Sequence, residues 1–553
     1  MNFVHETRQA RFRHPFGARP AGSKVYLAIE DYGWEEPLRV TVMYTYGLYE
    51  FSDGRMRLTR EPLKPHEEKT GYQNEPRRRW STTLRLPGNP CLFFYYFEIE
   101  MSGGRIFRLV KTPDDSDSSY CTEEIPAVDP RLKTPRFFQI TVYEPNFKTP
   151  EWSKGALMYQ IFPDRFNRGA DYDEEKMRKA WPAPERIYHS NWYSDVDYRG
   201  RPGYGYLACD FFGGTLQGIT EKLPYLHDLG VEILYLNPIY QARSNHRYDA
   251  ADYQRVDPLL GTSEDFHELT VAAKKLGIRV IIDIALNHTG ADSVYFNRLN
   301  RYPSVGAWQE QQGEGISPYG SWYNFFYKDG KLTYNSWWGF PDLPAVNEND
   351  LSFREFVLGE GGVLLHWLKL GASGFRLDVS DELPDDFLRD LYKVVKRAKP
   401  DALILGEVWE DATNKYSYHS YRDFAFGKTH DSFMNYPFRN AVVKFFGSKC
   451  SALEFVNALE TLRENYPPEI FMTNMNLLGS HDVSRIVTAL SGIHDPGERS
   501  KQVQIHLSPD LRKEAINRLL MATLFQSLYP GMPSLYYGDE VAMEGFRDPF
   551  NRQ

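Results

Sequence analysis

The 553-residue chain is poor in cysteine, in positive charge and in long apolar runs. Its four cysteines, Cys91, Cys121, Cys209 and Cys450, lie far apart, which excludes a disulfide scaffold or a zinc site of usual spacing and favours a reducing, cytoplasmic location. The net charge is −9 and there is no basic stripe, so we expect no nucleic-acid partner. No run approaches 18 apolar residues and the N-terminus lacks a signal-peptide core, so we expect no membrane partner.

Aromatic residues, by contrast, are abundant. They make up 15% of the chain, beside an ordinary 42% hydrophobic and 25% charged residues. Tyrosine and tryptophan suit sites that bind flat, amphipathic ligands such as sugar rings, but they suit large cores equally well. Composition alone leaves both interpretations open.

The first part of the chain predicts an all-β domain. Residues 1–110 hold β-branched and aromatic runs such as "KVYLAIED", "WSTTLRLP" and "CLFFYYFEIEM", with turn signals between them. Short strands at this spacing predict a β-sandwich. Residues 111–153 are acidic, polar and contain prolines, so we interpret them as a linker.

The remainder, residues 154–553, alternates strand-like and helical patterns. Eight strand candidates follow one another: "ALMYQIFP", "VEILYLNP", "IRVIIDIALNH", "GFRLDV", "ALILGEVWE", "DSFMNYP", "FMTNMNLLGSHD" and "PSLYYGDE". Such alternation is typical of a parallel sheet with right-handed crossovers. We therefore predict the α/β class and a (β/α)8 barrel, with a doubly wound open sheet as the alternative. Residues 289–347, rich in tryptophan, tyrosine, glycine and proline, form a long insertion after the third strand.

Polar residues end four of these strands, and one strand is followed by a polar loop. They are Asp283 and His288 at strand 3, Arg376 and Asp378 at strand 4, Glu407 at strand 5, His481 and Asp482 at strand 7, and Tyr248 in the loop after strand 2. The carboxyl ends of barrel strands meet at one face, so these side chains should line one mouth. Any one of them could be an ordinary strand end. Together, several like charges are a poor arrangement for stability, which favours a catalytic role.

The chemistry that suits this set is glycoside cleavage, which needs one ionised and one protonated carboxyl group. Arg376 and Asp378 lie two residues apart on one strand and so face the same way. We expect Arg376 to keep Asp378 ionised, although a purely structural salt bridge is the alternative. Glu407 has no basic neighbour in sequence, so an apolar setting would raise its pKa and suit a general acid.

Four segments in order, "DIALNH", "GFRLDVSDE", "GEVW" and "LLGSHD", resemble the conserved segments of the α-amylase family, glycoside hydrolase family 13. The N-terminal sandwich is similar to that of the neopullulanase, cyclomaltodextrinase and maltogenic amylase branch, or of related pullulan-active amylases, and "GEVWEDATNK" and "MNYPF" favour the latter. The resemblance implies a retaining hydrolase of α-1,4 bonds, and as an alternative also of α-1,6 bonds, in starch fragments, pullulan or cyclodextrins.

The resemblance also implies individual roles. Asp378 would be the nucleophile, Glu407 the general acid and base, and Asp482 the third carboxylate. The substrate-binding residues would be Tyr248, Asp283, His288, Arg376 and His481, and residues 289–347 would be the inserted domain B. An α-glucan would be the partner, and the N-terminal module would bind glucan or form a homodimer.

Two departures from the family pattern concern metal and length. Relatives often bind calcium near the loop after strand 1, partly through an aspartate in "FFGGD", but this chain has "FFGGT" with Thr215. We expect no cofactor for the chemistry and leave calcium open. The chain ends at Gln553, just after strand 8, without an eighth helix or C-terminal β-domain. We therefore expect the sequence to be incomplete, and we expect a version extended by the missing parts to be more stable.

Two other functions remain open on the same fold. One is a catalytically silent glucan-binding protein, which the presence of all three carboxylates disfavours. The other is a transglycosylase or an α-1,6-specific enzyme. Residues beyond the first subsite, such as Ser380–Glu382 and Trp337–Trp338, would decide between these activities, although the two tryptophans suit the core of the insertion equally well.

Overall fold

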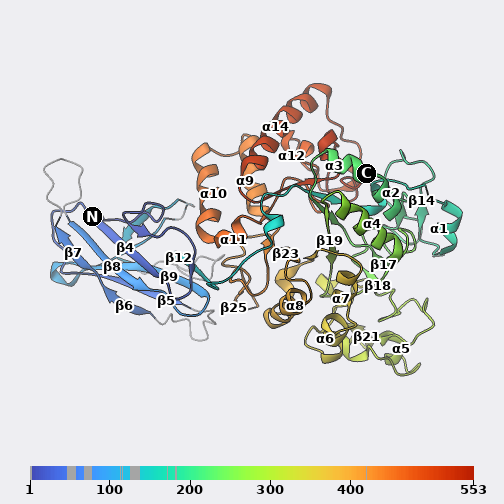
Figure 1. Ribbon diagram of the computed structural model, residues 1–553, viewed down its shortest axis with the longest axis horizontal. Coiled ribbons are helices and arrows are strands. Elements are labelled where there is room, and N and C mark those ends of the chain that lie inside the picture. The colour runs from blue at the N-terminus through green and yellow to red at the C-terminus, as the bar shows by residue number, and fades with distance from the viewer. Residues whose placement is uncertain are drawn as a thin grey trace. The chain divides into compact units, whose positions relative to one another are not determined.

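The computed structural model describes residues 3–46, 58–67, 78–112, 114, 116–124, 137–170, 172–180, 183–418 and 420–553 (Figure 1). The chain forms two compact units, each built from three stretches. Unit 1 comprises Met1–Lys148, Trp409–Asp431 and Ser448–Met472, and unit 2 comprises Thr149–Val408, Ser432–Gly447 and Thr473–Gln553. The units are therefore discontinuous in sequence, whereas the domains predicted above, 1–110 and 154–553, are continuous.

Two β-sheets form most of unit 1. The first orders its strands β1-β4-β8-β7, with β2 also paired to β4, and the second orders them β11-β10-β9-β12-β3, with β5 between β9 and β6. All pairs are antiparallel except β12 with β3. The strands are β1 (Phe3–Val4), β2 (Arg13–His14), β3 (Arg19–Pro20), β4 (Lys24–Asp31), β5 (Arg39–Tyr46), β6 (Thr59–Pro62), β7 (Lys64–Glu67), β8 (Arg78–Arg85), β9 (Cys91–Glu100), β10 (Ile106–Lys111), β11 (Ser119–Thr122) and β12 (Phe138–Tyr143).

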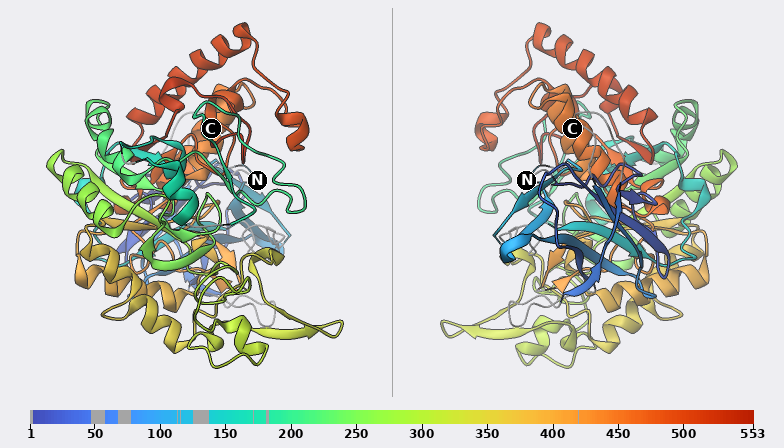
Figure 2. Two further views of the ribbon diagram at one scale, coloured as in Figure 1. Left: turned by 90° about the vertical axis from the view of Figure 1, so that its right-hand side faces the viewer. Right: turned by 90° about the vertical axis from the view of Figure 1, so that its left-hand side faces the viewer.

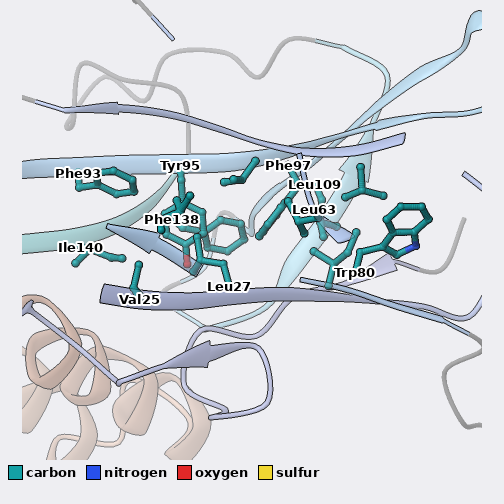
Figure 3. Close-up of a cluster of buried hydrophobic side chains, with 14 of the residues drawn as sticks. Val25, Leu27, Leu63, Trp80, Phe93, Tyr95, Phe97, Leu109, Phe138 and Ile140 are labelled. Atoms are coloured by element: carbon teal, nitrogen blue, oxygen red, sulfur yellow. The ribbon is translucent and has the colours of Figure 1, made fainter. Parts of the chain in front are cut away.

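The two sheets enclose one apolar core, as predicted for a sandwich (Figure 3). Alternate residues of β4, such as Val25 and Leu27, face Phe93, Tyr95 and Phe97 of β9 across it. Because strand side chains alternate between faces, the period of two in "KVYLAIED" already places these residues on one side. The sandwich thus follows from the strand pattern.

The predicted linker 111–153 is in part a strand of this sandwich, which corrects that boundary. In β12, Ile140 pairs with Phe93, and both Ile140 and Val142 are buried in the core. The alternating "FQITVY" carried this signal, but the polar residues before it concealed it. Residues 125–136 of the predicted linker lie outside the described residues.

The second sheet is also buried on its other face, by later parts of the chain that belong to unit 1. Phe94 and Tyr96 of β9 pack in a cluster that includes Tyr421 and Phe426. The elements in these parts are the hairpin β24 (Tyr416–Ser417) and β25 (Ser420–Tyr421), and the helices α10 (Ala452–Asn465) and α11 (Pro468–Phe471). Burial on both faces explains why "CLFFYYF" in β9 is apolar without alternation.

Unit 2 contains the predicted eight-stranded parallel barrel. Its order is β26-β23-β22-β19-β16-β13-β28-β27, and a parallel bridge from Met434 to Met475 joins the first and last strands. The strands are β13 (Met158–Ile161), β16 (Ile233–Leu236), β19 (Arg279–Ile284), β22 (Gly374–Leu377), β23 (Leu403–Gly406), β26 (Ser432–Phe433), β27 (Met475–Leu477) and β28 (Met532–Tyr536). The barrel is confirmed: seven of the eight predicted runs contain one strand each, and the eighth overlaps β28, which begins one residue earlier at Met532.

Helices lie around the outside of these strands, with the green, gold and red ones clearest in Figure 2. In unit 2 they are α1 (Glu174–Ala180), α2 (Leu216–Glu221), α3 (Leu223–Asp228), α4 (Ser263–Lys275), α6 (Leu351–Leu358), α7 (Val363–Lys369), α8 (Asp385–Ala398), α9 (Tyr436–Phe446), α12 (Ile486–Leu490), α13 (Arg499–Gln502) and α14 (Pro509–Leu528). Among the described residues, the crossover from β23 to β26 contains no helix, and the hairpin β24–β25 of unit 1 takes its place. None of the described helices is long and apolar enough to cross a membrane.

The insertion after β19 has little regular structure. It holds α5 (Ala307–Gln311) and the hairpin β20 (Phe325–Lys328) and β21 (Lys331–Tyr334), which extends outward in Figure 2 in yellow-green. Two further pairs follow earlier barrel strands: β14 (Ile187–Tyr188) with β15 (Asp210–Phe211), and β17 (Tyr240–Ala242) with β18 (Ala250–Val256).

The inward face of the barrel changes from apolar to polar along β13, β16, β19 and β23. At its start it is filled by Met158, Ile233, Ile281 and Leu403, which share one buried cluster. Two or four residues later, the same face carries the buried polar side chains Gln160, Asn237, Asp283 and Glu407. A packed floor therefore supports a polar layer at the carboxyl ends, where barrel active sites lie.

Candidate active site

Arg376 is the centre of the polar layer. Its NH1 nitrogen lies 2.8 Å from Asp283 Oδ1 and 2.6 Å from Asp378 Oδ1, and its NH2 nitrogen lies 2.7 Å from Glu407 Oε2. The guanidinium is fully buried, and its Nε faces Met434 Sδ at 3.4 Å. One guanidinium thus brings together three predicted site residues from three adjacent strands, β19, β22 and β23.

The balance of charge around Arg376 favours retention of a proton. Burial raises the pKa of Asp378 well above its usual range; Arg376 lowers it, but Glu407 and Asp283 raise it further. Burial likewise raises the pKa of Asp283 against the opposing effect of Arg376. The expectation that Arg376 simply keeps Asp378 ionised needs correction, because a single positive charge serves three carboxyl groups. A proton shared within this cluster is the arrangement we infer.

A strained turn follows Asp378 directly. Val379 has φ 37° and ψ 49°, in the left-handed region that β-branched residues rarely adopt. In this conformation its backbone N–H donates to Glu407 Oε2 at 2.9 Å. Glu407 Oε2 therefore accepts hydrogen bonds from the Arg376 guanidinium and from the backbone N–H of Val379, the residue after Asp378. The two carboxyl groups are thus positioned by the same turn.

Strand 7 and the loop after strand 2 complete the mouth. The Tyr248 hydroxyl donates to Asp283 Oδ2 at 2.7 Å and lies 2.6 Å from His481 Nε2. The Tyr248 and His481 rings stack at 5.3 Å, and Asp482 Oδ1 lies 3.2 Å from His481 Nε2. Burial, opposed by Arg376 and Arg552, raises the pKa of Asp482.

His481 is held in one tautomer by two amides. Gln160 Nε2 lies 2.9 Å and Asn237 Nδ2 lies 3.1 Å from His481 Nδ1, and both amide groups donate. The ring therefore accepts at Nδ1 and carries its proton at Nε2, towards Tyr248 and Asp482. Burial, aided by Arg552 and Arg376, lowers the pKa of His481 well below its usual range, so the ring is neutral.

His288 joins the mouth to the insertion. Its Nε2 donates to the Tyr248 carbonyl at 3.2 Å, its ring stacks on Trp337 at 5.6 Å, and burial lowers its pKa to about 3. The indole N–H groups of Trp337 and Trp338 donate to Glu382 at 2.8 Å and 2.6 Å. All eight predicted site residues therefore lie in unit 2 and form one connected set.

Sequence reasoning missed several members of this set. Gln160, Asn237 and Tyr235 lie on the inward face of β13 and β16, and the Tyr235 hydroxyl donates to Asp283 Oδ2 at 2.6 Å. The period-two pattern of these strands could have revealed them, because each follows an inward apolar residue. The donor at Val379 had no signal, since a backbone N–H carries none. In the part of the chain that the structure describes, no group of three or more His, Cys, Asp or Glu residues is placed to hold a metal.

Comparison with known proteins agrees with this geometry. Residues 160–552 match the family model described as alpha amylase, catalytic domain. The chain is 35% identical over 588 residues to an amylopullulanase of Thermoanaerobacter thermohydrosulfuricus, covering 99% of this chain and 37% of that protein. It is 33% identical over 411 residues to neopullulanase 2 of Thermoactinomyces vulgaris, covering 73% of this chain and 59% of that protein. The chain thus spans less than two thirds of the length of either relative.

A solved structure is also similar to this chain. The type III pullulan hydrolase from Thermococcus kodakarensis aligns with a TM-score of 0.60 at 26% sequence identity. The alignment covers 100% of this chain and 83% of that one, so it includes the sandwich as well as the barrel.

Proposed function

This chain belongs to the α-amylase family, and from that premise we propose that it is a retaining glycoside hydrolase that cleaves α-1,4 bonds in starch fragments, pullulan or cyclodextrins. The observation that carries the proposal is the shared guanidinium of Arg376. Retaining hydrolysis needs two carboxyl groups close together with one proton between them. Asp378 and Glu407 contact different nitrogens of the Arg376 guanidinium, and burial raises the pKa of Asp378.

We assign the two steps as follows. The Asp378 carboxylate attacks the anomeric carbon while Glu407 gives its proton to the leaving glycosidic oxygen, so the C–O bond breaks and a glycosyl ester forms. A water then gives a proton to the Glu407 carboxylate and adds its oxygen to the anomeric carbon, which releases Asp378. Glu407 Oε2 already faces Arg376 and the Val379 N–H, so we place the mobile proton on Oε1.

The other predicted residues would bind the sugar in the first subsite. Neutral His481, with its proton at Nε2, and Asp482 lie side by side at the mouth and would hydrogen-bond ring hydroxyls. His288 and Tyr248 would contact the same ring, and Asp283 would hold Tyr248 and Arg376 in place. These roles rest on the family membership and on the contacts above.

A second candidate activity is cleavage of α-1,6 bonds by the same carboxyl groups. It is favoured by the amylopullulanase relative, whose likeness extends over 99% of this chain rather than over the barrel alone. Ser380–Glu382 and the tryptophans bound to Glu382 lie beside the catalytic strands and would select between the bonds.

Product chromatography tests both proposals. The protein is incubated with pullulan, soluble starch and β-cyclodextrin, with Asp378→Asn as the matched control. Panose from pullulan indicates α-1,4 cleavage, and maltotriose indicates α-1,6 cleavage. We expect oligosaccharides from the parent and none from Asp378→Asn.

No product from a folded parent on all three substrates would contradict the hydrolase proposal and favour the silent glucan-binding protein. Retention of the anomeric configuration, followed by NMR of the first products, separates a retaining from an inverting enzyme.

We also propose a cytoplasmic location and a homodimer. The four cysteines lie far apart in the sequence and two of them, Cys91 and Cys209, are buried, which supports a reducing compartment. The homodimer rests on the family branch alone. Light scattering during size-exclusion chromatography measures the oligomeric state, and a monomer at micromolar concentration would refute the homodimer.

A further inference from the structure

We propose that Arg168 takes the place of a calcium ion in the long loop after β13, so that this loop is stabilised by a guanidinium and binds no calcium. The site lies where family members often bind the metal, and Thr215 already departs from their pattern. The inference concerns stability and does not depend on the proposed hydrolysis.

Three backbone carbonyls converge on the Arg168 side chain. Nε donates to the Phe212 carbonyl at 2.7 Å, NH1 to the Ser190 carbonyl at 2.8 Å, and NH2 to the His189 carbonyl. Each of the three nitrogens therefore has its own oxygen. A single cation holds two separate stretches of the loop together.

These carbonyls need a hydrogen-bond donor because they lie just beyond the ends of two short strands. His189 and Ser190 follow β14, and Phe212 follows β15 at the end of the same short parallel pair. The three carbonyls lie beyond the last paired residues of β14 and β15, and the partly buried ones of His189 and Phe212 require a donor, which Arg168 supplies. Hard oxygen atoms arranged in this way suit either calcium or a charged N–H group.

The remaining walls suit a guanidinium and not a metal. The Arg168 carbon Cζ lies 4.3 Å from the centre of the Tyr172 ring and 5.3 Å from that of Trp192. Aromatic faces attract a flat, weakly hydrated cation. Calcium takes six to eight oxygen ligands, and the two rings fill positions that its carboxylates or waters would need.

Among the described residues of this loop, Thr215 and two glutamates have other partners. Thr215 Oγ1 accepts the N–H groups of Gly218 at 2.9 Å and Gly169 at 3.2 Å, as the cap of α2. Glu174 and Glu175, the two glutamates of the candidate calcium segment "NRGADYDEE", pair with Arg178 and Lys179 on α1. Asp171 of the same segment lies outside the described residues. A calcium ion would also meet the fixed charge of Arg168 at close range, which is repulsive.

The first test measures the melting temperature (Tm) of the parent protein after treatment with EDTA, and again after addition of calcium chloride. We expect no shift in either case. Arg168→Ala should lower Tm by at least about 3 °C. Arg199→Ala is the matched control, because Arg199 is exposed in the same loop and lies over Tyr198, and it should leave Tm nearly unchanged.

Chemical rescue identifies the missing group. Guanidinium chloride at roughly 10 mM, far below denaturing concentrations, should raise the Tm of Arg168→Ala and leave that of the parent and of Arg199→Ala unchanged. Arg168→Lys should recover little, because one ammonium cannot serve three carbonyls in this geometry.

Calcium titrations decide the metal side of the proposal. Isothermal titration of the parent should give no binding heat, whereas the double variant Arg168→Asn, Thr215→Asp should gain calcium binding and a calcium-dependent Tm. A fall in the parent Tm with EDTA that calcium reverses would overturn the proposal. So would a Tm of Arg168→Ala equal to that of the parent.

Discussion

Each unit buries a cluster of charges, and the two clusters have opposite balance. In unit 1, Glu464 of α10 contacts Arg13 and, at 3.3 Å, Arg8. Burial alone raises the pKa of Glu464, but the arginines and Lys111 outweigh it and bring the pKa to about 2. In unit 2, one arginine, Arg376, serves three carboxyl groups, and the pKa of Asp378 is raised well above its usual range.

Burial raises the pKa in both clusters, so the ratio of acids to bases decides the direction of the net shift. Where arginines outnumber the acid, the carboxylate stays charged at every physiological pH and the pair fastens α10 to the first residues of the sandwich. Where acids outnumber the arginine, one of them holds a proton. The first arrangement is suited to stability, and the second to acid–base chemistry.

The largest expected effect comes from a substitution in the charge cluster around Arg376 in unit 2. Glu407→Gln should lower kcat on α-glucans roughly 10²–10⁴-fold, the usual contribution of a general acid. A substrate whose leaving group needs no proton, such as a glycosyl fluoride, should lose far less in its first step. Steady-state and single-turnover kinetics on the two substrates measure this, and equal losses on both would contradict the role of Glu407 as proton donor.

The next largest effect comes from a substitution in the charge cluster around Glu464 in unit 1. Glu464→Gln should cost on the order of 3 kcal/mol at neutral pH, because the pKa is about 2 in the fold and 4.5 without its partners. A lowered pKa contributes stability above pH 4.5 that is lost as pH falls towards 2, so parent and variant should converge in acid. Tm measured from pH 7 to pH 3 tests this.

Glu460→Gln is the matched control for this prediction. Glu460 lies on the same helix and pairs with Arg463 at the surface. An exposed pair contributes little, so its removal should change the free energy of unfolding by less than about 1 kcal/mol. A similar cost for both variants would remove the contrast between buried and exposed pairs.

A smaller effect, of opposite sign, should appear when Asp378 itself is made neutral. Its raised pKa means that ionisation costs stability as pH rises above its unfolded value of 3.8. Asp378→Asn should therefore be more stable than the parent by about 0.5–2 kcal/mol at neutral pH, although inactive, and the gain should vanish near pH 4. Thermal unfolding of both proteins at pH 7 and pH 4 measures the difference, and a gain that does not depend on pH would point to another cause.

The smallest effect concerns the turn between the catalytic strands. Val379→Gly removes the strain of a β-branched residue at φ 37° and should stabilise the protein by about 1 kcal/mol. Its kcat should fall, because the N–H that faces Glu407 is then less fixed. Val379→Ile keeps the branched side chain and should show no gain in Tm. A gain in Tm without loss of kcat would show that the strain serves no positioning role.

The sequence predicted the strands of both units better than their boundaries. Seven of the eight barrel strands fall within the predicted runs and β28 begins one residue before its run, because buried parallel strands are short, apolar and bounded by turns. The prediction of a linker was wrong at Phe138–Tyr143, where a six-residue strand follows a long polar stretch. The missing helix between β23 and β26 could not be anticipated, because the apolar residues Tyr421 and Phe426 belong to the other unit's core.

For the site, residue types were predictable and electrostatics was not. The order of acids at strand ends placed Asp378 and Glu407 at one mouth. The contact of Glu407 with Arg376 depends on how β22 and β23 align, and no neighbour in sequence indicates it. For the same reason Arg168 passed unnoticed, since its three carbonyls come from residues that lie about 20 to 45 positions away.

The three-stretch composition of unit 1 limits how the gene can be recombined. A fragment ending at Lys148 would contain the sandwich strands but neither Tyr421 and Phe426, which cover the outer face of β9, nor Glu464, which neutralises Arg13. The aromatic face would be bare and the arginine unpaired. The sandwich therefore cannot be exchanged between relatives by itself: the exchange has to include the two distant stretches, 409–431 and 448–472, and we expect substitutions there to coevolve with the first 148 residues.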